Sequence, residues 1–191
     1  MLDSHIRENL VITHIKRLFL AVLLCASFSA FALDLIQMKQ GVNSADLNGD
    51  GRIDYFFLAQ YDNNKSHPSQ TITFYIQKPE GGYSIMPSIV KHEFTYFSLS
   101  LSGSNIAVSD FSLVRDKEKF YFVTSDKISI NAYDKQTFNF TLYQFVENED
   151  NPGASLYSWE KTAEATSSSK YISAIDSFKE LELHFSTAEK N

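Results

Sequence analysis

Short runs of apolar and aromatic residues, separated by polar turns, follow one another along the chain. Ile53 to Gln60 is a continuous run of strand-forming residues, and Thr71 to Gln77 alternates apolar and polar residues, as a strand with one exposed face does. The polar segment 61–68 between these two runs predicts an antiparallel hairpin with a long loop. Further strands are expected at residues 94–101, 105–115, 119–125, 128–132 and 138–146.

Many short strands without alternating helices predict a mainly β fold, a single-domain antiparallel β-sandwich or roll. The C-terminal region changes character, because Tyr171, Ile175, Phe178 and Leu181 recur at helical spacing. These residues predict one amphipathic helix that covers the sheet, with Ser169 as its N-cap. No internal repeat indicates a propeller or a solenoid.

The first 32 residues have the three parts of a secretory signal peptide. His14 to Arg17 form a basic edge, Leu18 to Ala26 form an apolar run, and Ala30-Phe31-Ala32 is a cleavage site with a small residue on either side of a large one. A transmembrane helix needs about 20 apolar residues, and this apolar run is shorter. We expect cleavage after Ala32, a mature domain of residues 33–191, and no membrane insertion after cleavage.

Charge and cysteine content narrow the environment of this mature domain. The net charge of −6 becomes −7 once residues 1–32 are removed, because they contain three basic and two acidic residues. No basic stripe of the kind that follows a phosphate backbone is visible, which argues against a nucleic-acid partner. The only cysteine, Cys25, lies in the leader. An acidic, exported domain without cysteine fits the periplasm.

The segment from Asp46 to Asp54 has the spacing of a calcium-binding loop, with oxygen ligands at every second position and a glycine at the sixth. The predicted ligands are the side chains of Asp46, Asn48, Asp50 and Asp54 and the backbone carbonyl of Arg52. An EF-hand is excluded, because Phe57 stands where the twelfth-position glutamate belongs and the next segment is strand-like. Calcium would have a structural role and pin the loop. The alternative is a tight turn closed by side chains that bond their own backbone.

Candidate catalytic motifs are weak. The histidines after residue 32 are scattered and form no zinc-binding pair. Ser167 to Lys170 matches the Ser-x-x-Lys of penicillin-recognising enzymes, with near-matches to the other two motifs at Ser125 and Lys161, but their order along the chain is wrong. We therefore expect no catalytic residues and no enzymatic activity.

Aromatic residues are frequent, and several are adjacent, as in Tyr96-Phe97 and Phe120-Tyr121-Phe122. Neighbours along a strand point to opposite faces of a sheet, so some strands carry rings on both faces. Either both faces are covered, or one face is exposed and forms a groove for a planar ligand or a partner subunit, including a second copy of the chain.

Taken together, several of these features resemble the carbapenem intrinsic-resistance proteins of the CarG-like type. They are the signal peptide, Gly41-Val42-Asn43 leading into the Asp46–Asp54 loop, the turn from Asp62 to Pro68 before a Phe-Tyr-Ile strand, and the late segments 149–153 and 172–178. The resemblance implies a periplasmic protein that protects a bacterium from carbapenems without hydrolysis, by binding the β-lactam or shielding its targets. It also implies that the Asp46–Asp54 loop organises the site and that His67 faces a carboxylate ligand.

A competing hypothesis is a calcium-stabilised surface or adhesion module that uses an aromatic face to bind another protein. Drug binding predicts saturable stabilisation by a carbapenem, whereas an interaction module predicts concentration-dependent association. A third reading, an unrecognised hydrolase, predicts turnover of a chromogenic β-lactam.

Overall fold

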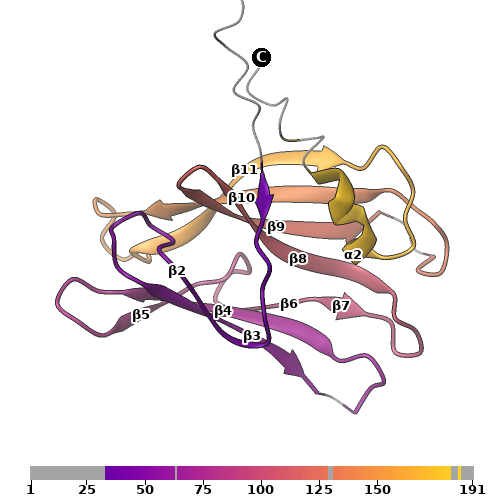
Figure 1. The fold of residues 1–191 in the computed structure, drawn as a ribbon, viewed down its shortest axis with the longest axis horizontal. Coiled ribbons are helices and arrows are strands. Elements are labelled where there is room, and N and C mark those ends of the chain that lie inside the picture. Colours follow the sequence, from indigo (N-terminus) through magenta and orange to yellow (C-terminus); the bar gives the residue numbers. More distant parts are fainter. Residues whose placement is uncertain (1–32, 63, 129–130, 182–184, 186–191) are drawn as a thin grey trace, which may run out of the picture. The chain divides into compact units, whose positions relative to one another are not determined.

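The strands form two antiparallel sheets that pack face to face (Figure 1). The computed structural model describes residues 33–62, 64–128, 131–181 and 185, so the predicted signal peptide, its cleavage site and Cys25 lie outside the described residues. Sheet A consists of β1 (Asp34–Leu35), β7 (Leu99–Ser100), β8 (Ala107–Asp116), β9 (Lys119–Lys127), β10 (Phe138–Glu147) and β11 (Tyr157–Thr166). Sheet B consists of β2 (Gly41–Ala45), β3 (Asp54–Tyr61), β4 (Ser69–Gln77), β5 (Tyr83–Met86) and β6 (Thr95–Phe97). This arrangement confirms the predicted mainly β sandwich.

The order of the strands follows largely from hairpins. Sheet A has the order β1-β8-β9-β10-β11, with β7 also paired to β8, and sheet B has the order β2-β3-β4-β5, with β6 also paired to β4. The predicted hairpin of residues 53–60 and 71–77 is confirmed as β3 and β4, with Phe56 opposite Phe74 in the register. The strands expected at 105–115, 119–125 and 138–146 are confirmed as β8, β9 and β10.

The main core lies between the two sheets and is strongly aromatic. Sheet B contributes Phe56, Ile72 and Phe74, which alternate with outward-facing residues because successive side chains of a strand point to opposite faces. Phe74 contacts Phe122 of β9 and Trp159 of β11, with ring centroids 6.0 and 5.2 Å apart. Edge-to-face pairs of this kind add about 0.5–1.5 kcal/mol each to the effect of burial. The two sheets are therefore held together by interlocking rings.

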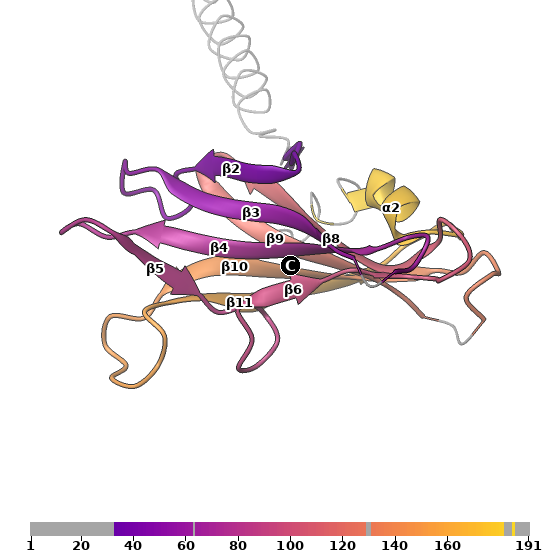
Figure 2. The ribbon, with the colours of Figure 1, turned by 90° about the horizontal axis from the view of Figure 1, so that it is seen from below.

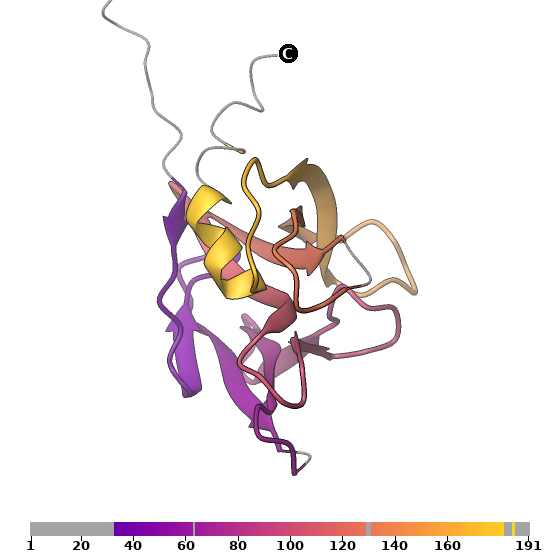
Figure 3. The ribbon, with the colours of Figure 1, turned by 90° about the vertical axis from the view of Figure 1, so that its right-hand side faces the viewer.

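The outer face of sheet A is covered by the C-terminal segment (Figure 3). Tyr121 and Val123 of β9 and Phe140 of β10 pack there against Leu33 and Leu181. This cluster explains why Tyr121 is buried although its neighbours Phe120 and Phe122 face the opposite core. Both faces of β9 at Phe120-Tyr121-Phe122 are thus covered, which is the first of the two alternatives that the sequence left open.

The C-terminal helix begins later than predicted. It opens with α2 (Ala174–Ser177) and the 3₁₀ turn η1 (Phe178–Glu180), and its N-cap is Ser173, so the prediction of Ser169 was wrong. The Ser169 backbone N–H is instead occupied, since it donates to the buried carboxylate of Glu180 at 3.0 Å. Ile175 is 55% exposed, and the buried face is formed by Ala174 and Ser177.

Two predicted strands differ from the structure. Residues 94–101 were expected to form one strand, but the chain leaves sheet B after β6 and joins sheet A at β7. Ser98 marks the crossover: it is buried, its N–H donates to Gln70 O, and its Oγ accepts from Gln70 N, both at 2.8 Å. A strand at 128–132 is also wrong, because the described residues Ile128, Asn131 and Ala132 are not in a strand. Ala132 instead begins a turn, and its carbonyl oxygen accepts a hydrogen bond from Lys127 Nζ.

Four strands of the structure were missed by the pattern: β1, β2, β5 and β11. β11 pairs with β10 along its whole length, yet only Tyr157 and Trp159 of this strand are buried. The remaining positions of this edge strand are charged, polar or alanine, a composition that hides the apolar alternation on which a sequence prediction depends.

A half-buried carboxylate introduces a pH dependence into sheet A. Asp110 stands opposite Ser125 in the register of β8 and β9, on the face that carries Val114 and the C-terminal segment. Burial raises the pKa of Asp110 to about 6, although a hydrogen bond from Phe111 N to Asp110 Oδ1 opposes the rise. The folded protein therefore binds this proton more tightly than the unfolded chain, and stability falls as pH rises from about 4 through about 6.

We predict that Asp110→Asn raises the thermal midpoint at pH 7.5 by several degrees, because it removes a half-buried charge that costs up to about 3 kcal/mol. The advantage of the variant should shrink towards pH 4, where Asp110 is protonated in the folded protein. Thermal unfolding followed by circular dichroism across pH 4–8 tests this, with Glu160→Gln, an exposed carboxylate on β11, as the matched control. Equal behaviour of the two variants would contradict the prediction.

Candidate functional site

The segment between β2 and β3 forms a tight loop in which side-chain oxygens bond the backbone. Asp46 Oδ1 accepts from Gly49 N at 2.8 Å, and Asp46 Oδ2 accepts from Gly51 N at 2.8 Å. Asp50 Oδ1 accepts from Arg52 N at 2.8 Å, and Asn48 Nδ2 donates to Asp50 Oδ2 at 2.8 Å. Both glycines have positive φ, 78° and 81°, a conformation that other residues adopt only at a cost. The loop therefore gathers three of the predicted calcium ligands, Asp46, Asn48 and Asp50.

The two remaining predicted ligands lie in a different environment. Asp54 is fully buried at the start of β3, where its Oδ2 accepts from Leu47 N and its Oδ1 from Gln77 N, both at 2.8 Å. Burial raises its pKa, against the lowering effect of these two hydrogen bonds. Arg52 places its guanidinium on the carboxylate of Asp50, where it supplies a positive charge of its own. Burial acts to raise the pKa of Asp50, but hydrogen bonds from Arg52 N and Asn48 and the charge of Arg52 outweigh it, so the pKa is lowered.

This geometry fits a cation only in part. Asp46, Asn48 and Asp50 present oxygen atoms on one loop, as calcium requires, while both carboxylate oxygens of Asp54 are engaged by backbone N–H groups. Across the part of the chain that the structure describes, no group of three or more His, Cys, Asp or Glu side chains is arranged to hold a metal ion. The hydrogen bonds observed are those of the alternative reading, a turn closed by its own side chains.

A cavity of about 550 Å³ opens beside this loop and is also lined by residues of the turn between β8 and β9. We call it the loop pocket. Its apolar lining comes from Ile36, Ala45, Phe56 and Phe120, and its charged lining comes from Asp46, Arg115, Lys117 and Glu118. The pocket thus joins residues of both sheets, and the predicted loop forms only one of its walls.

His67 does not lie near the loop pocket. It belongs to the loop between β3 and β4, which follows the far end of β3, and the length of β3 alone separates the two sites by about 23 Å. The structure therefore does not bring His67 together with the Asp46–Asp54 loop.

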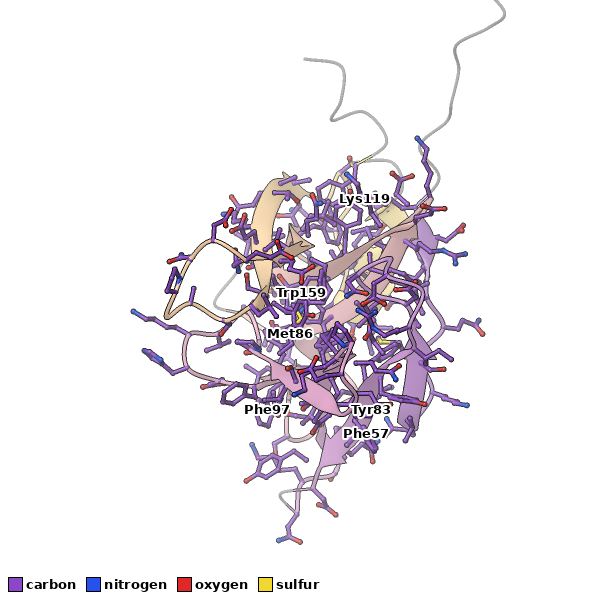
Figure 4. All side chains as sticks on the ribbon, turned by 90° about the vertical axis from the view of Figure 1, so that its left-hand side faces the viewer. Phe57, Tyr83, Met86, Phe97, Lys119 and Trp159 are labelled. Carbon is purple, nitrogen blue, oxygen red and sulfur yellow. The ribbon has the colours of Figure 1, made fainter. Side chains whose placement is uncertain are left out.

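The outer face of sheet B carries the second candidate surface. Val42, Tyr55, Phe57, Tyr75 and Tyr83 line a shallow hollow of about 330 Å³, which we call the aromatic face. Tyr55 packs edge-on against Tyr83, and Phe57 against Tyr75, with ring centroids 5.5 and 6.2 Å apart. Figure 4 shows Phe57 and Tyr83 on the side of sheet B away from Trp159 and Met86, which lie in the core. Seen from below, sheet B lies in front, and no described element covers it (Figure 2).

Sequence reasoning missed both of these surfaces as assembled sites. Arg115 and Lys117 follow the loop by about 60 residues, and only the sheet packing places them opposite it. The alternation of β3, β4 and β5 does place Tyr55, Phe57, Tyr75 and Tyr83 on one face, so the aromatic face has a sequence signal once the pairing is known.

Fold and site together define a small two-sheet β-sandwich with a charged, apolar-floored pocket at one end. The model of the family described as carbapenem resistance protein CarG-like matches residues 38–180. The crystal structure of CarG is similar to this chain, with 40% sequence identity, a TM-score of 0.75, and coverage of 78% of this chain and 95% of that chain. A comparison with curated proteins found no match. The chain belongs to the CarG-like family of carbapenem resistance proteins.

The calcium prediction can be tested through stability. We expect calcium at ten times its dissociation constant to stabilise the protein by about 1.4 kcal/mol, and Asp50→Asn to lose most of this gain because one anionic ligand is gone. Arg52→Gln should be stabilised at lower calcium concentrations than the parent, because the Arg52 guanidinium no longer competes with calcium for the carboxylate of Asp50. Thermal midpoints in calcium and in chelator measure these effects, and a parent midpoint that does not change with calcium would leave the self-closed turn as the explanation.

Proposed function

We propose that this chain is an exported, non-enzymatic protein that protects a bacterium from carbapenems by binding the antibiotic or shielding its targets. The observation that carries the proposal is the family match, which extends from residue 38 to residue 180 and so includes the Asp46–Asp54 loop, the turn between β8 and β9, and most of both sheets. The 40% identity to CarG over almost the whole of that chain supports it further.

Antibiotic binding is supported by the loop pocket. Small-molecule sites in proteins commonly have volumes of about 300–1,000 Å³. The loop pocket, at about 550 Å³, lies within this range and combines an apolar floor with a charged rim. A carbapenem combines a compact bicyclic ring with a carboxylate, a combination that suits an apolar floor with cationic groups at the rim.

A mechanism without hydrolysis is supported by the state of the two serines that resemble nucleophile motifs. Ser167 is buried, its Oγ donates to Ser169 O at 2.8 Å, and the same oxygen accepts from Phe138 N at 3.0 Å. Ser125 is fully buried and shares a 2.6 Å hydrogen bond with Ser177. Buried hydroxyls with these partners stabilise β9, β10 and the C-terminal segment, and neither is placed to attack a substrate.

Export is supported by the predicted signal peptide and by the family, whose resistance role concerns an antibiotic that acts outside the cytoplasm. Within the described ranges, no helix is long and apolar enough to cross a membrane. On the basis of the signal peptide and the family, we propose a periplasmic location for residues 33–191.

The proposal is tested by the inhibitory concentration of a carbapenem for a sensitive bacterium that secretes this chain. We expect a rise with the full chain and no rise with a chain that starts at residue 33, because the shorter protein stays in the cytoplasm. In a parallel assay, purified protein should protect the cells in proportion to its amount and leave the antibiotic chemically intact. Consumption of many antibiotic molecules per protein molecule would show an enzyme instead.

The aromatic face favours a second candidate function, the binding of another protein or of a second copy of the chain. Phe57 and Tyr83 are 45% and 47% exposed, and contiguous apolar surface of this kind marks interaction sites on soluble proteins. Aromatic residues are also enriched at the centres of protein interfaces. This function is compatible with shielding of the antibiotic's targets.

We predict that the parent associates as its concentration rises and that Phe57→Ser/Tyr83→Ser reduces this association at least tenfold, since each ring contributes 1 kcal/mol or more to a typical interface. Analytical ultracentrifugation measures the effect. The matched control is Tyr133→Ser, which removes a tyrosine that is 65% exposed on the loop between β9 and β10. A parent that remains monomeric at all concentrations would leave self-association without support.

A further inference from the structure

We propose that the loop pocket is a binding site for a small organic carboxylate with a compact apolar body, in which Lys117 and Arg115 hold the carboxylate and Phe56 and Phe120 contact the body. This assignment rests on the proposed function, because a carbapenem is a molecule of that class. It adds the location of the site, the orientation of the ligand and the residues that distinguish it.

The floor of the pocket is formed by the margin of the main core. Phe56 of β3 and Phe120 of β9 are almost fully buried, come from different sheets and both reach the cavity, and Ile36 closes it on the side of β1. These side chains are fixed by the inter-sheet packing, so the floor needs little rearrangement to accept an apolar ring. A preformed apolar floor lowers the entropic cost of binding.

The rim above this floor carries two cations from one short segment. Arg115 is near the end of β8, and Lys117 is the first residue of the two-residue turn that leads into β9. The guanidinium of Arg115 lies 3.7 Å from Asp34 in an exposed ion pair, a type of contact worth at most about 1 kcal/mol, so it is free to turn towards a bound anion. For the described residues, no ion pair is formed by Lys117.

The backbone at Lys117 gives an independent indication that this side chain has a role. Its φ is 54°, a left-handed conformation in which glycine or asparagine is favoured over other residues. A lysine at this turn costs stability relative to glycine, and such strained positions gather at ligand-binding sites. The cost is explained if the turn must present a positive charge to the pocket.

The negative residues of the rim set the orientation of the ligand. Asp46 lies on the wall formed by the β2–β3 loop, and Glu118 is the neighbour of Lys117 in the turn. Because Asp46 repels an anion, the carboxylate must face the β8–β9 side of the pocket while the apolar body covers Phe56 and Phe120. Glu118 competes with the ligand carboxylate for the side chains of Arg115 and Lys117. Removing the charge of Lys117 should therefore weaken ligand binding, and removing the charge of Glu118 should strengthen it.

The test uses imipenem as the probe and the mature chain in isothermal titration calorimetry. Lys117→Asn should weaken binding about tenfold, since it removes one charge-assisted contact, and asparagine tolerates the backbone conformation. Glu118→Gln should strengthen binding roughly threefold, because it removes a nearby negative charge. Lys119→Gln, which removes an exposed lysine of the same hairpin that does not line the pocket, should bind as the parent does.

A carboxyl-esterified form of imipenem separates charge from shape. The ester should bind the parent and Lys117→Asn with equal affinity, because the contact that the variant loses is made to the carboxylate. Equal loss of affinity for imipenem and for its ester would show that Lys117 acts through the fold, and it would overturn the proposal.

The outcomes also separate this inference from the proposed function. If the parent binds imipenem and Lys117→Asn, Arg115→Gln and Glu118→Gln all bind it equally well, the loop pocket is the wrong site, whereas antibiotic binding stands. If the parent binds no imipenem, antibiotic binding fails and the pocket assignment fails with it.

Discussion

The packing of Phe74 against Phe122 and Trp159 is the contact on which the rest of the structure depends. These rings join the middle strand of sheet B to two strands of sheet A, in a described chain that contains no cysteine to cross-link them. Because each strand must direct its large side chains towards this core, the opposite faces of the two sheets are decided as well. Sheet A buries its outer face under the C-terminal segment, and sheet B leaves tyrosines and phenylalanines exposed.

Two buried carboxylates connect this framework to its irregular segments. Asp54 ties the β2–β3 loop to β4 through Leu47 N and Gln77 N, and Glu180 holds the segment before α2 by accepting from Ser168 N and Tyr171 Oη, both at 2.7 Å. Each replaces a regular backbone ladder where the chain leaves a sheet. Buried backbone N–H donors need such partners, because a buried N–H without a hydrogen bond reduces the stability of the fold by about 1–3 kcal/mol. Asp54 thereby fixes the position of the β2–β3 loop, which forms one wall of the loop pocket.

Much of the fold follows from period-two alternation, and the errors have local causes. The pattern locates β3, β4, β8, β9 and β10, where several large apolar residues face one core. It cannot locate β11, because only Tyr157 and Trp159 of this strand are buried in the core. It also cannot locate the break at Ser98, where the chain passes from one sheet to the other at a single buried serine. The spacing of Asp46, Asn48 and Asp50 predicts a loop whose side chains converge, whereas Arg115 and Lys117 are invisible as part of the same site because only tertiary packing unites them.

The Asp46–Asp54 loop, for which calcium binding is predicted, and the loop pocket share Asp46, so their electrostatics are coupled. In the structure the rim carries Arg115 and Lys117 against Asp46 and Glu118, a balanced set of charges. A cation held by Asp46 and Asp50 would cancel the negative wall, and the rim would become net positive and more attractive to a carboxylate. Linkage is reciprocal, so a bound anion would raise the affinity of the loop for the cation by the same factor. In the alternative arrangement, the guanidinium of Arg52 pairs with the carboxylate of Asp50 and already supplies a positive charge on the loop. The pocket would then bind an anion without metal. The two readings of the loop therefore differ in whether ligand affinity depends on calcium, and both place the carboxylate on the side of Lys117.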